Sequence, residues 1–181
     1  SWLRHGWPGI MLDVFREHLP PRAGESAEAT TALLNSIALG LNGQPTIRQM
    51  MRFAELVRER GGPELDPEAM RAIYQDRLDR EIAARTASIT TGRKSADDFV
   101  VAGARPFLTE LSRTGIPLAI LSSTVEHRVK EEAALLGLTG FFGNRIHGGT
   151  GDPAKFSKRA VFDRLLAESG VPGARLLSFG D

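Results

Sequence analysis

The sequence predicts an α/β protein in which a helical part precedes a parallel β-sheet flanked by helices. Residues 1–100 show only helical hydrophobic periodicity, and no strand pattern appears among them. After residue 100, short apolar runs alternate with amphipathic segments, an order typical of strand–helix–strand units and a parallel sheet. We therefore expect two domains, a helical one at 1–100 and an α/β one at 101–181.

Amphipathic helices are expected at about 8–18, 26–41 and 46–60, and another begins at residue 66. Their apolar faces must bury one another, because isolated helices of this length are marginal in water. Ser26 and Asp66 are placed to act as N-caps, and Pro67 then takes the first helical position. The residues expected in the core include Leu34, Ile37, Met50, Met51, Val57, Met70, Ile73, Tyr74 and Leu78.

In the second half, the nearly all-apolar run 116–121 is typical of a strand buried on both faces of a parallel sheet. Further short strands are expected within 141–146 and at 175–179. Helices are expected at 105–113, with Phe107 facing inward, at 124–136, with Thr124 as N-cap, and at 158–168. Ligands bind at the carboxyl ends of parallel strands, so two strand ends, Ser122-Ser123 and Gly180-Asp181, are candidate sites.

The composition excludes several classes of protein. The chain is 41% hydrophobic and 25% charged, with a net charge of +1, which favours neither a nucleic acid nor an anionic membrane as partner. No apolar run approaches the roughly 18 residues of a membrane-spanning helix, and no signal peptide is recognisable. Cysteine is absent, which excludes disulfides and fits a cytoplasmic location.

Three features with residue types suited to catalysis follow one another along the chain. An apolar strand ends at Ser122, Lys158 begins a helix, and a second apolar strand ends at Gly180-Asp181. This ordered set resembles motifs II, III and IV of the haloacid dehalogenase (HAD) superfamily over about residues 102–181. Residues 1–100 resemble the helical cap that such enzymes insert before motif II. The resemblance implies a Rossmann-like core, here incomplete, with an inserted cap domain.

The resemblance also implies an activity, that of a Mg²⁺-dependent phosphohydrolase acting on a small phosphorylated metabolite through an aspartyl-phosphate. Such chemistry needs donors and cations that neutralise the transferring phosphoryl group. By this resemblance Ser122, helped by Ser123, donates hydrogen bonds to the phosphate, and Lys158 supplies positive charge. Asp181 binds Mg²⁺, a hard cation that prefers carboxylate oxygens. Lys155 is the alternative to Lys158.

The chain departs from the family pattern at motif I. No Asp-x-Asp-Gly-Thr string occurs, and Asp13 is no substitute because it lies within a helical pattern without a following Gly-Thr. The acidic residue that normally follows Gly-Asp in motif IV is also absent. We therefore expect the chain to be a segment whose motif I precedes Ser1, and to be inactive alone.

Other interpretations remain open from the sequence. A phosphomutase or a dehalogenase would share this fold, and an inactive α/β binding module would share it without chemistry. Ser122 and Asp181 can also be ordinary turn residues, and Lys158 a solvated one. The glycine-rich segment 148–153 fits neither phosphate-binding glycine motif, so a plain loop is expected there. The histidines show no metal-ligand spacing.

Overall fold

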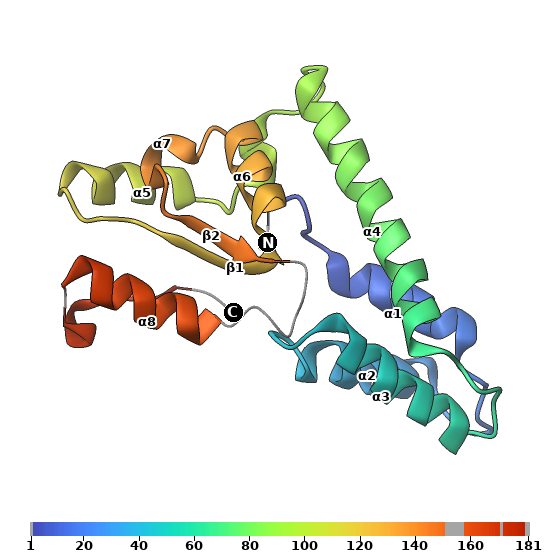
Figure 1. The fold of residues 1–181 in the computed structure, drawn as a ribbon. Coiled ribbons are helices and arrows are strands. Elements are labelled where there is room, and N and C mark those ends of the chain that lie inside the picture. The colour runs from blue at the N-terminus through green and yellow to red at the C-terminus, as the bar shows by residue number, and fades with distance from the viewer. Residues whose placement is uncertain (1, 151–157, 171, 180–181) are drawn as a thin grey trace. The chain divides into compact units, whose positions relative to one another are not determined.

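The computed structural model describes residues 2–150, 158–170 and 172–179. The chain divides into two compact units, Leu3–Arg85 and Thr86–Asp181. The first is built from helices alone, whereas the second holds a parallel sheet with helices (Figure 1). The predicted fold class, a parallel α/β sheet combined with a helical part, is confirmed.

The helical unit contains α1 (Trp7–His18), α2 (Ala27–Gly40), α3 (Thr46–Glu59) and α4, which continues to residue 90 (Pro67–Thr90). These bounds lie within a residue or two of the predicted ones wherever a bound was predicted. Ser26 is the N-cap of α2, and its hydroxyl accepts the Ala29 N–H at 3.1 Å. Asp66 accepts the Glu68 N–H at 3.0 Å before α4. No described helix combines the length and apolar composition that crossing a membrane requires.

The core of the helical unit is formed by buried side chains from all four of these helices. Phe15 and Phe53 are fully buried, and their rings stack with centroids 4.1 Å apart. Met50 is buried as predicted, but Met51 is 41% exposed, so the prediction that both face the core is wrong. Consecutive helical residues point about 100° apart, and Met51 lies to one side of the buried face that holds Met50. Ile73, next to buried Tyr74, is likewise 36% exposed.

The second unit begins with the end of α4 and the 3₁₀ helix η1 (Ala96–Phe99). Then follow α5 (Ala104–Arg113), β1 (Ile120–Val125), α6 (Glu126–Leu135), α7 (Thr139–Phe142), β2 (Ile146–Gly149), α8 (Lys158–Ser169) and the 3₁₀ helix η2 (Gly173–Arg175). In the described part of the chain, β1 and β2 form one parallel pair, with Ile120 opposite Ile146. Parallel pairing with an intervening helix is the predicted arrangement.

The strand positions differ from the predicted ones. Residues 116–119 precede β1, and Ile116 is 52% exposed. Pro117 explains part of this shift, because proline has no N–H to donate to a strand ladder. The strand instead runs through Ser122 to Val125, and Val125 rather than Thr124 is the N-cap of α6, so that prediction was wrong.

Two further strand predictions were also wrong. Phe141 and Phe142 lie in α7, and the strand begins only at Ile146. The run 176–179 pairs with no described strand, and Leu177 and Phe179 are 76% and 70% exposed. Phe107, expected to face inward, is 47% exposed and its ring meets that of Phe179 edge-on at 5.6 Å. These side chains find too little apolar surface within the described part of the unit.

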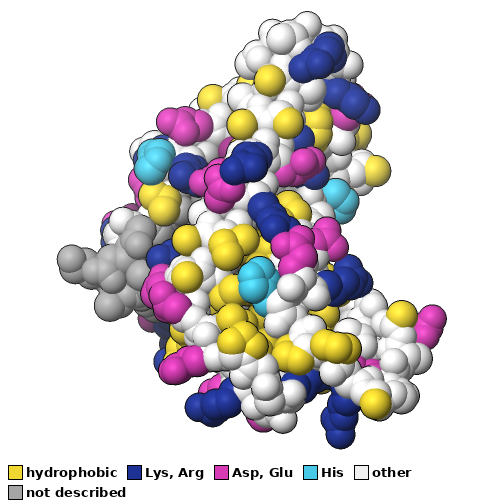
Figure 2. Space-filling model, turned by 90° about the vertical axis from the view of Figure 1, so that its right-hand side faces the viewer, with side chains coloured by type: hydrophobic (Ala, Val, Ile, Leu, Met, Phe, Trp, Pro, Cys, Tyr) yellow, Lys and Arg dark blue, Asp and Glu magenta, His cyan; other side chains and the backbone are white. Residues whose placement is uncertain are grey.

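The surface carries charges of both signs. Figure 2 shows Lys and Arg side chains interspersed with Asp and Glu over one face. Many of them pair along one helix, as Arg71 does with Glu68, and Arg77 of α4 reaches Glu17 of α1. Such exposed pairs contribute little each, so the packing of apolar faces carries the stability of the helical unit.

Candidate functional site

The end of strand β1 carries a bulge. Leu121 lies opposite His147 and Val125 opposite Gly149, so β1 advances four residues (125 − 121) while β2 advances two (149 − 147). The two additional residues of β1 must leave the regular ladder, and a bulge of this kind re-aims side chains and often lies beside an active site. The bulge occupies the carboxyl end of a parallel strand, the edge where sheets of this class bind ligands.

Ser122 is held within this bulge by its own hydroxyl. Its Oγ accepts the Thr124 N–H at 3.1 Å, and the residue is half-buried. An accepting hydroxyl still has its hydrogen to donate, so Ser122 can give a hydrogen bond to an anion. Ser123 is exposed, and its hydroxyl can reach solvent or a ligand. Two predicted phosphate-binding residues therefore lie together at this edge.

Gly148 and Gly149 pack against the bulge so closely that a side chain would not fit. A Cβ on Gly148 would stand 2.6 Å from the Thr124 carbonyl oxygen, and one on Gly149 would stand 2.8 Å from that of Ser123. Cβ atoms in proteins do not approach other atoms to less than about 3.0 Å. The expected plain loop is therefore wrong at these two residues, which belong to β2 and need to be glycine.

Glu126, the first residue of α6, was not singled out in the sequence. Its carboxylate accepts the Gly148 N–H at 3.2 Å and pairs with the Lys130 ammonium at 2.5 Å. The Lys130 hydrogen bond, then that of Gly148, lowers the pKa of Glu126, and the charge of nearby His147 adds to this. The sequence signal was an acid in the first turn with a lysine four residues later, a pattern too common to mark a site.

The other predicted site residues lie elsewhere or outside the described residues. Lys158 is the first residue of α8, a helix that contacts β1, and its side chain is exposed. Asp181, Gly180 and Lys155 fall outside the described residues. The structure therefore brings Ser122 and Ser123 together and tests neither the cation nor the metal ligand.

Magnesium needs several oxygen ligands around one point. Among residues 2–150, 158–170 and 172–179, no group of three or more His, Asp or Glu side chains is placed to hold a metal ion. The described residues therefore do not by themselves fit a Mg²⁺ site. In this part of the chain, the chemistry available at the end of β1 is hydrogen-bond donation to an anion.

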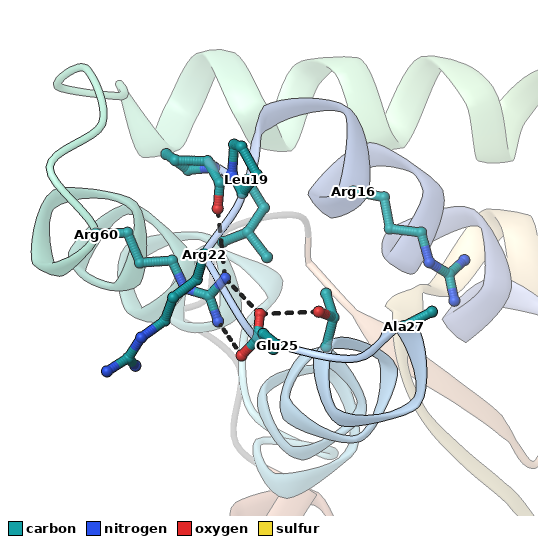
Figure 3. A pocket seen from close by; sticks show the side chains of 9 residues that line it. Arg16, Leu19, Arg22, Glu25, Ala27 and Arg60 are labelled. Carbon is teal, nitrogen blue, oxygen red and sulfur yellow. Dashed lines mark hydrogen bonds and ion pairs between the residues drawn. The ribbon is translucent and has the colours of Figure 1, made fainter.

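The helical unit has a hollow of its own, of about 310 Å³. It is lined by Arg16, Leu19, Pro20, Pro21, Arg22, Glu25, Ala27, Thr30 and Arg60. Arg60 donates two hydrogen bonds of 2.7 Å to the Glu25 carboxylate, whereas Arg16 and Arg22 extend away from this pair (Figure 3). The most buried charges of the hollow thus neutralise each other, and none of its residues was a predicted site residue.

A parallel strand pair with hydroxyl donors at its carboxyl edge, in a chain that also holds a helical unit, defines an α/β protein with a candidate anion site. The model of the haloacid dehalogenase-like hydrolase family matches residues 9–181. The chain belongs to this family, as its three motifs suggested. Comparison with curated proteins finds no match, and neither does comparison with solved structures.

Proposed function

We propose that the protein is a Mg²⁺-dependent phosphohydrolase of the cytoplasm that acts on a small phosphorylated metabolite through an aspartyl-phosphate. Membership of the hydrolase family supports the reaction class. The observation that carries the phosphate specificity is the bulge at the end of β1, where the Ser122 hydroxyl accepts the Thr124 N–H and can still donate its own hydrogen, beside exposed Ser123. The nucleophilic aspartate is not among these 181 residues, because no Asp-x-Asp-Gly-Thr string occurs in them.

Four residues of this chain have proposed parts in binding the phosphoryl group or the metal ion. Ser122 and Ser123 donate hydrogen bonds to its oxygens, and Lys158 supplies a positive charge as the transition state spreads negative charge over them. Asp181 is proposed as one Mg²⁺ ligand. No group of three or more candidate metal ligands occurs among the described residues, so we assign their side chains to phosphate binding alone.

The helical part, residues 1–100, is proposed to act as a cap, and residues 101–181 as part of the catalytic core. A cap that closes over a bound substrate excludes water and contributes to specificity. The two-unit division of the chain supports such a separation of tasks. The buried core of the helical unit is formed by residues of that unit alone, between Met11 and Leu78.

The test begins with the coding sequence before Ser1. A strand ending in Asp-x-Asp-Gly-Thr is expected there, and a longer protein that includes it should release phosphate from phosphate monoesters only with Mg²⁺. The 181-residue chain should show no such activity. In the longer protein, Ser122→Ala should lower kcat by about 10²- to 10³-fold, the effect of losing one preorganised donor to a transition-state oxyanion.

Other products would change the proposal in defined ways. Transfer of the phosphoryl group within the substrate, without free phosphate, would indicate a phosphomutase. Halide release from a 2-halo acid without Mg²⁺ would indicate a dehalogenase. An upstream strand without aspartate, together with phosphate binding but no turnover, would indicate a binding module, and Mg²⁺-dependent activity of the 181 residues alone would refute the placement of the nucleophile.

A further inference from the structure

The bulge at the end of β1 creates a problem for the strand beside it. In a regular parallel ladder, N–H groups of β2 donate to carbonyl oxygens of β1. Between the pairs Leu121–His147 and Val125–Gly149 the two strands are out of step, and the Gly148 N–H donates to the Glu126 carboxylate instead. A side chain of α6 therefore satisfies a backbone group of the sheet at the bulge.

The two oxygens of this carboxylate have separate partners. Oε2 accepts the Gly148 N–H at 3.2 Å, and Oε1 pairs with Lys130 at 2.5 Å. Glu126 directly follows Val125, the last residue of the bulged segment, so its side chain links the end of that segment to β2. The two strands are close here, because a Cβ on Gly148 or Gly149 would collide with the carbonyl oxygen of Thr124 or Ser123.

We propose that Glu126 is a positioning residue, whose hydrogen bond to the Gly148 N–H holds residues 122–125 against β2 and so aims the Ser122 and Ser123 hydroxyls at a phosphoryl group. This inference rests on the proposed function and deepens it. Glu126 acts through Ser122 and does not itself touch substrate, since a carboxylate beside a phosphate would repel it.

Glu126 has a second role, in stabilising α6, which requires its negative charge. An acid in the first turn of α6 also interacts with the helix dipole and with Lys130, four residues later. Those interactions need negative charge, whereas the bond to Gly148 needs an acceptor oxygen at the full length of a glutamate. Glu126→Gln keeps the length and an acceptor oxygen but loses the charge. Glu126→Asp keeps the charge but is shorter by one methylene.

The experiment uses the full 181-residue chain, labelled with ¹⁵N and titrated with inorganic phosphate. The amide signals of Ser122, Ser123 and Thr124 report phosphate binding, and the Gly148 amide signal reports the tether. We expect Glu126→Asp to shift the Gly148 signal and to weaken phosphate binding about tenfold, with Glu126→Gln close to the unchanged protein. Glu131→Asp, on an exposed carboxylate of the same helix, is the matched control and should change neither.

The outcomes separate this inference from the proposed function. If phosphate shifts no signal at residues 122–124 of the unchanged chain, the proposed phosphate role of Ser122 fails, and the inference fails with it. If phosphate binds there and Glu126→Asp binds it equally well, the inference alone is overturned. If Glu126→Gln weakens binding more than Glu126→Asp does, charge rather than reach is what matters, which also overturns it.

Discussion

The two units of the chain bury their apolar side chains to different degrees. In the helical unit, side chains from α1 to α4 form one buried core around stacked Phe15 and Phe53. In the sheet unit, burial centres on α6, α7 and β2, and Phe107 and Phe179 remain largely exposed. Helices can cover each other in sequence order, whereas a sheet needs neighbouring strands, of which the described residues supply two. A large apolar residue should therefore contribute more to stability in the helical unit than in the sheet unit.

The largest expected effect is on the free energy of unfolding, when one phenylalanine is removed from each unit. Phe53→Ala should lower the free energy of unfolding of the helical unit by about 3–5 kcal/mol, because it removes a fully buried ring and leaves a cavity. Phe107→Ala, at a ring that is 47% exposed, should cost within about 0.5 kcal/mol. Urea unfolding followed by circular dichroism measures both, and amide exchange assigns each loss to its unit.

Equal costs for the two phenylalanine variants would contradict the comparison. A large cost for Phe107→Ala in particular would mean that the ring is covered in solution. Phe53→Leu is the control for volume, since it keeps most of the apolar contact and should cost less than the alanine variant.

The second effect is the loss of stability when the hydrogen bonds of one arginine in the sheet unit are removed. Arg105 donates to the Leu136 carbonyl at 2.8 Å and to the Asp97 carboxylate at 2.7 Å, so one guanidinium joins α5 to η1 and to the end of α6. Arg105→Met should cost about 1.5–3 kcal/mol, the usual range for hydrogen bonds to a charged group. Arg113→Met, at an exposed pair on the same helix, is the control and should cost within about 0.5 kcal/mol.

These two results would show polar contacts compensating for a small apolar core. Unfolding of the sheet unit, followed by the exchange of α6 amides, is the measurement. An Arg105→Met variant as stable as Arg113→Met would mean that the apolar contacts of α6 and α7 suffice without this link.

The same contrast explains what could be predicted from the sequence. Helix signals are local, so Ser26 and Asp66 were placed correctly as caps, and the bounds of α1 to α3 were within a residue or two. Strand position depends on distant partners. The run 116–121 looked buried from its composition, yet the register with β2 places the strand at Ile120–Val125.

The candidate site also has features that the local sequence predicts and features that depend on a distant partner. Ser122 and Ser123 were singled out because their position after an apolar run matches a family motif, and their phosphate role stays a prediction. The bulge was not found, because two additional residues in one strand are defined only by the partner strand. Glu126 was missed for the same reason, since its role depends on a glycine 22 residues away in the chain. Asp181 and its proposed metal remain predictions.

The third effect compares the N-cap of α2, Ser26, with Thr124, which was predicted to be the N-cap of the helix now labelled α6. Ser26→Ala should cost about 1 kcal/mol, because the Ala29 N–H at the start of α2 loses its acceptor. Thr124→Ala removes no cap, since Val125 is the N-cap of α6, and α6 should keep its amide protection. Ser26→Asp restores an acceptor and should be close to the unchanged protein. Loss of protection in α6 on Thr124→Ala would show that Thr124 caps that helix after all.

The smallest effect concerns the pH dependence of the helical unit. Two hydrogen bonds from Arg77, at 2.7 and 2.6 Å, and its charge hold the pKa of Glu17 below its usual 4.5. A carboxyl whose pKa is lower in the folded protein contributes stability above its unfolded pKa and loses it as pH falls through the folded value. The unfolding temperature should therefore decline from about pH 4.5 downward, and Glu17→Gln should make that decline slightly shallower.

Both partners of this pair are substantially exposed, at 36% and 50%, so solvent screens the interaction and the change in slope should be small. Glu64→Gln, at an exposed carboxylate outside the helices, is the control and should leave the slope unchanged. Thermal unfolding between pH 3 and 7, at low and high salt, measures the effect. Since salt weakens exposed ion pairs, the difference between Glu17→Gln and the unchanged protein should shrink at high salt. A difference that persists there would mean that Glu17 is stabilised by its hydrogen bonds rather than by the charge of Arg77.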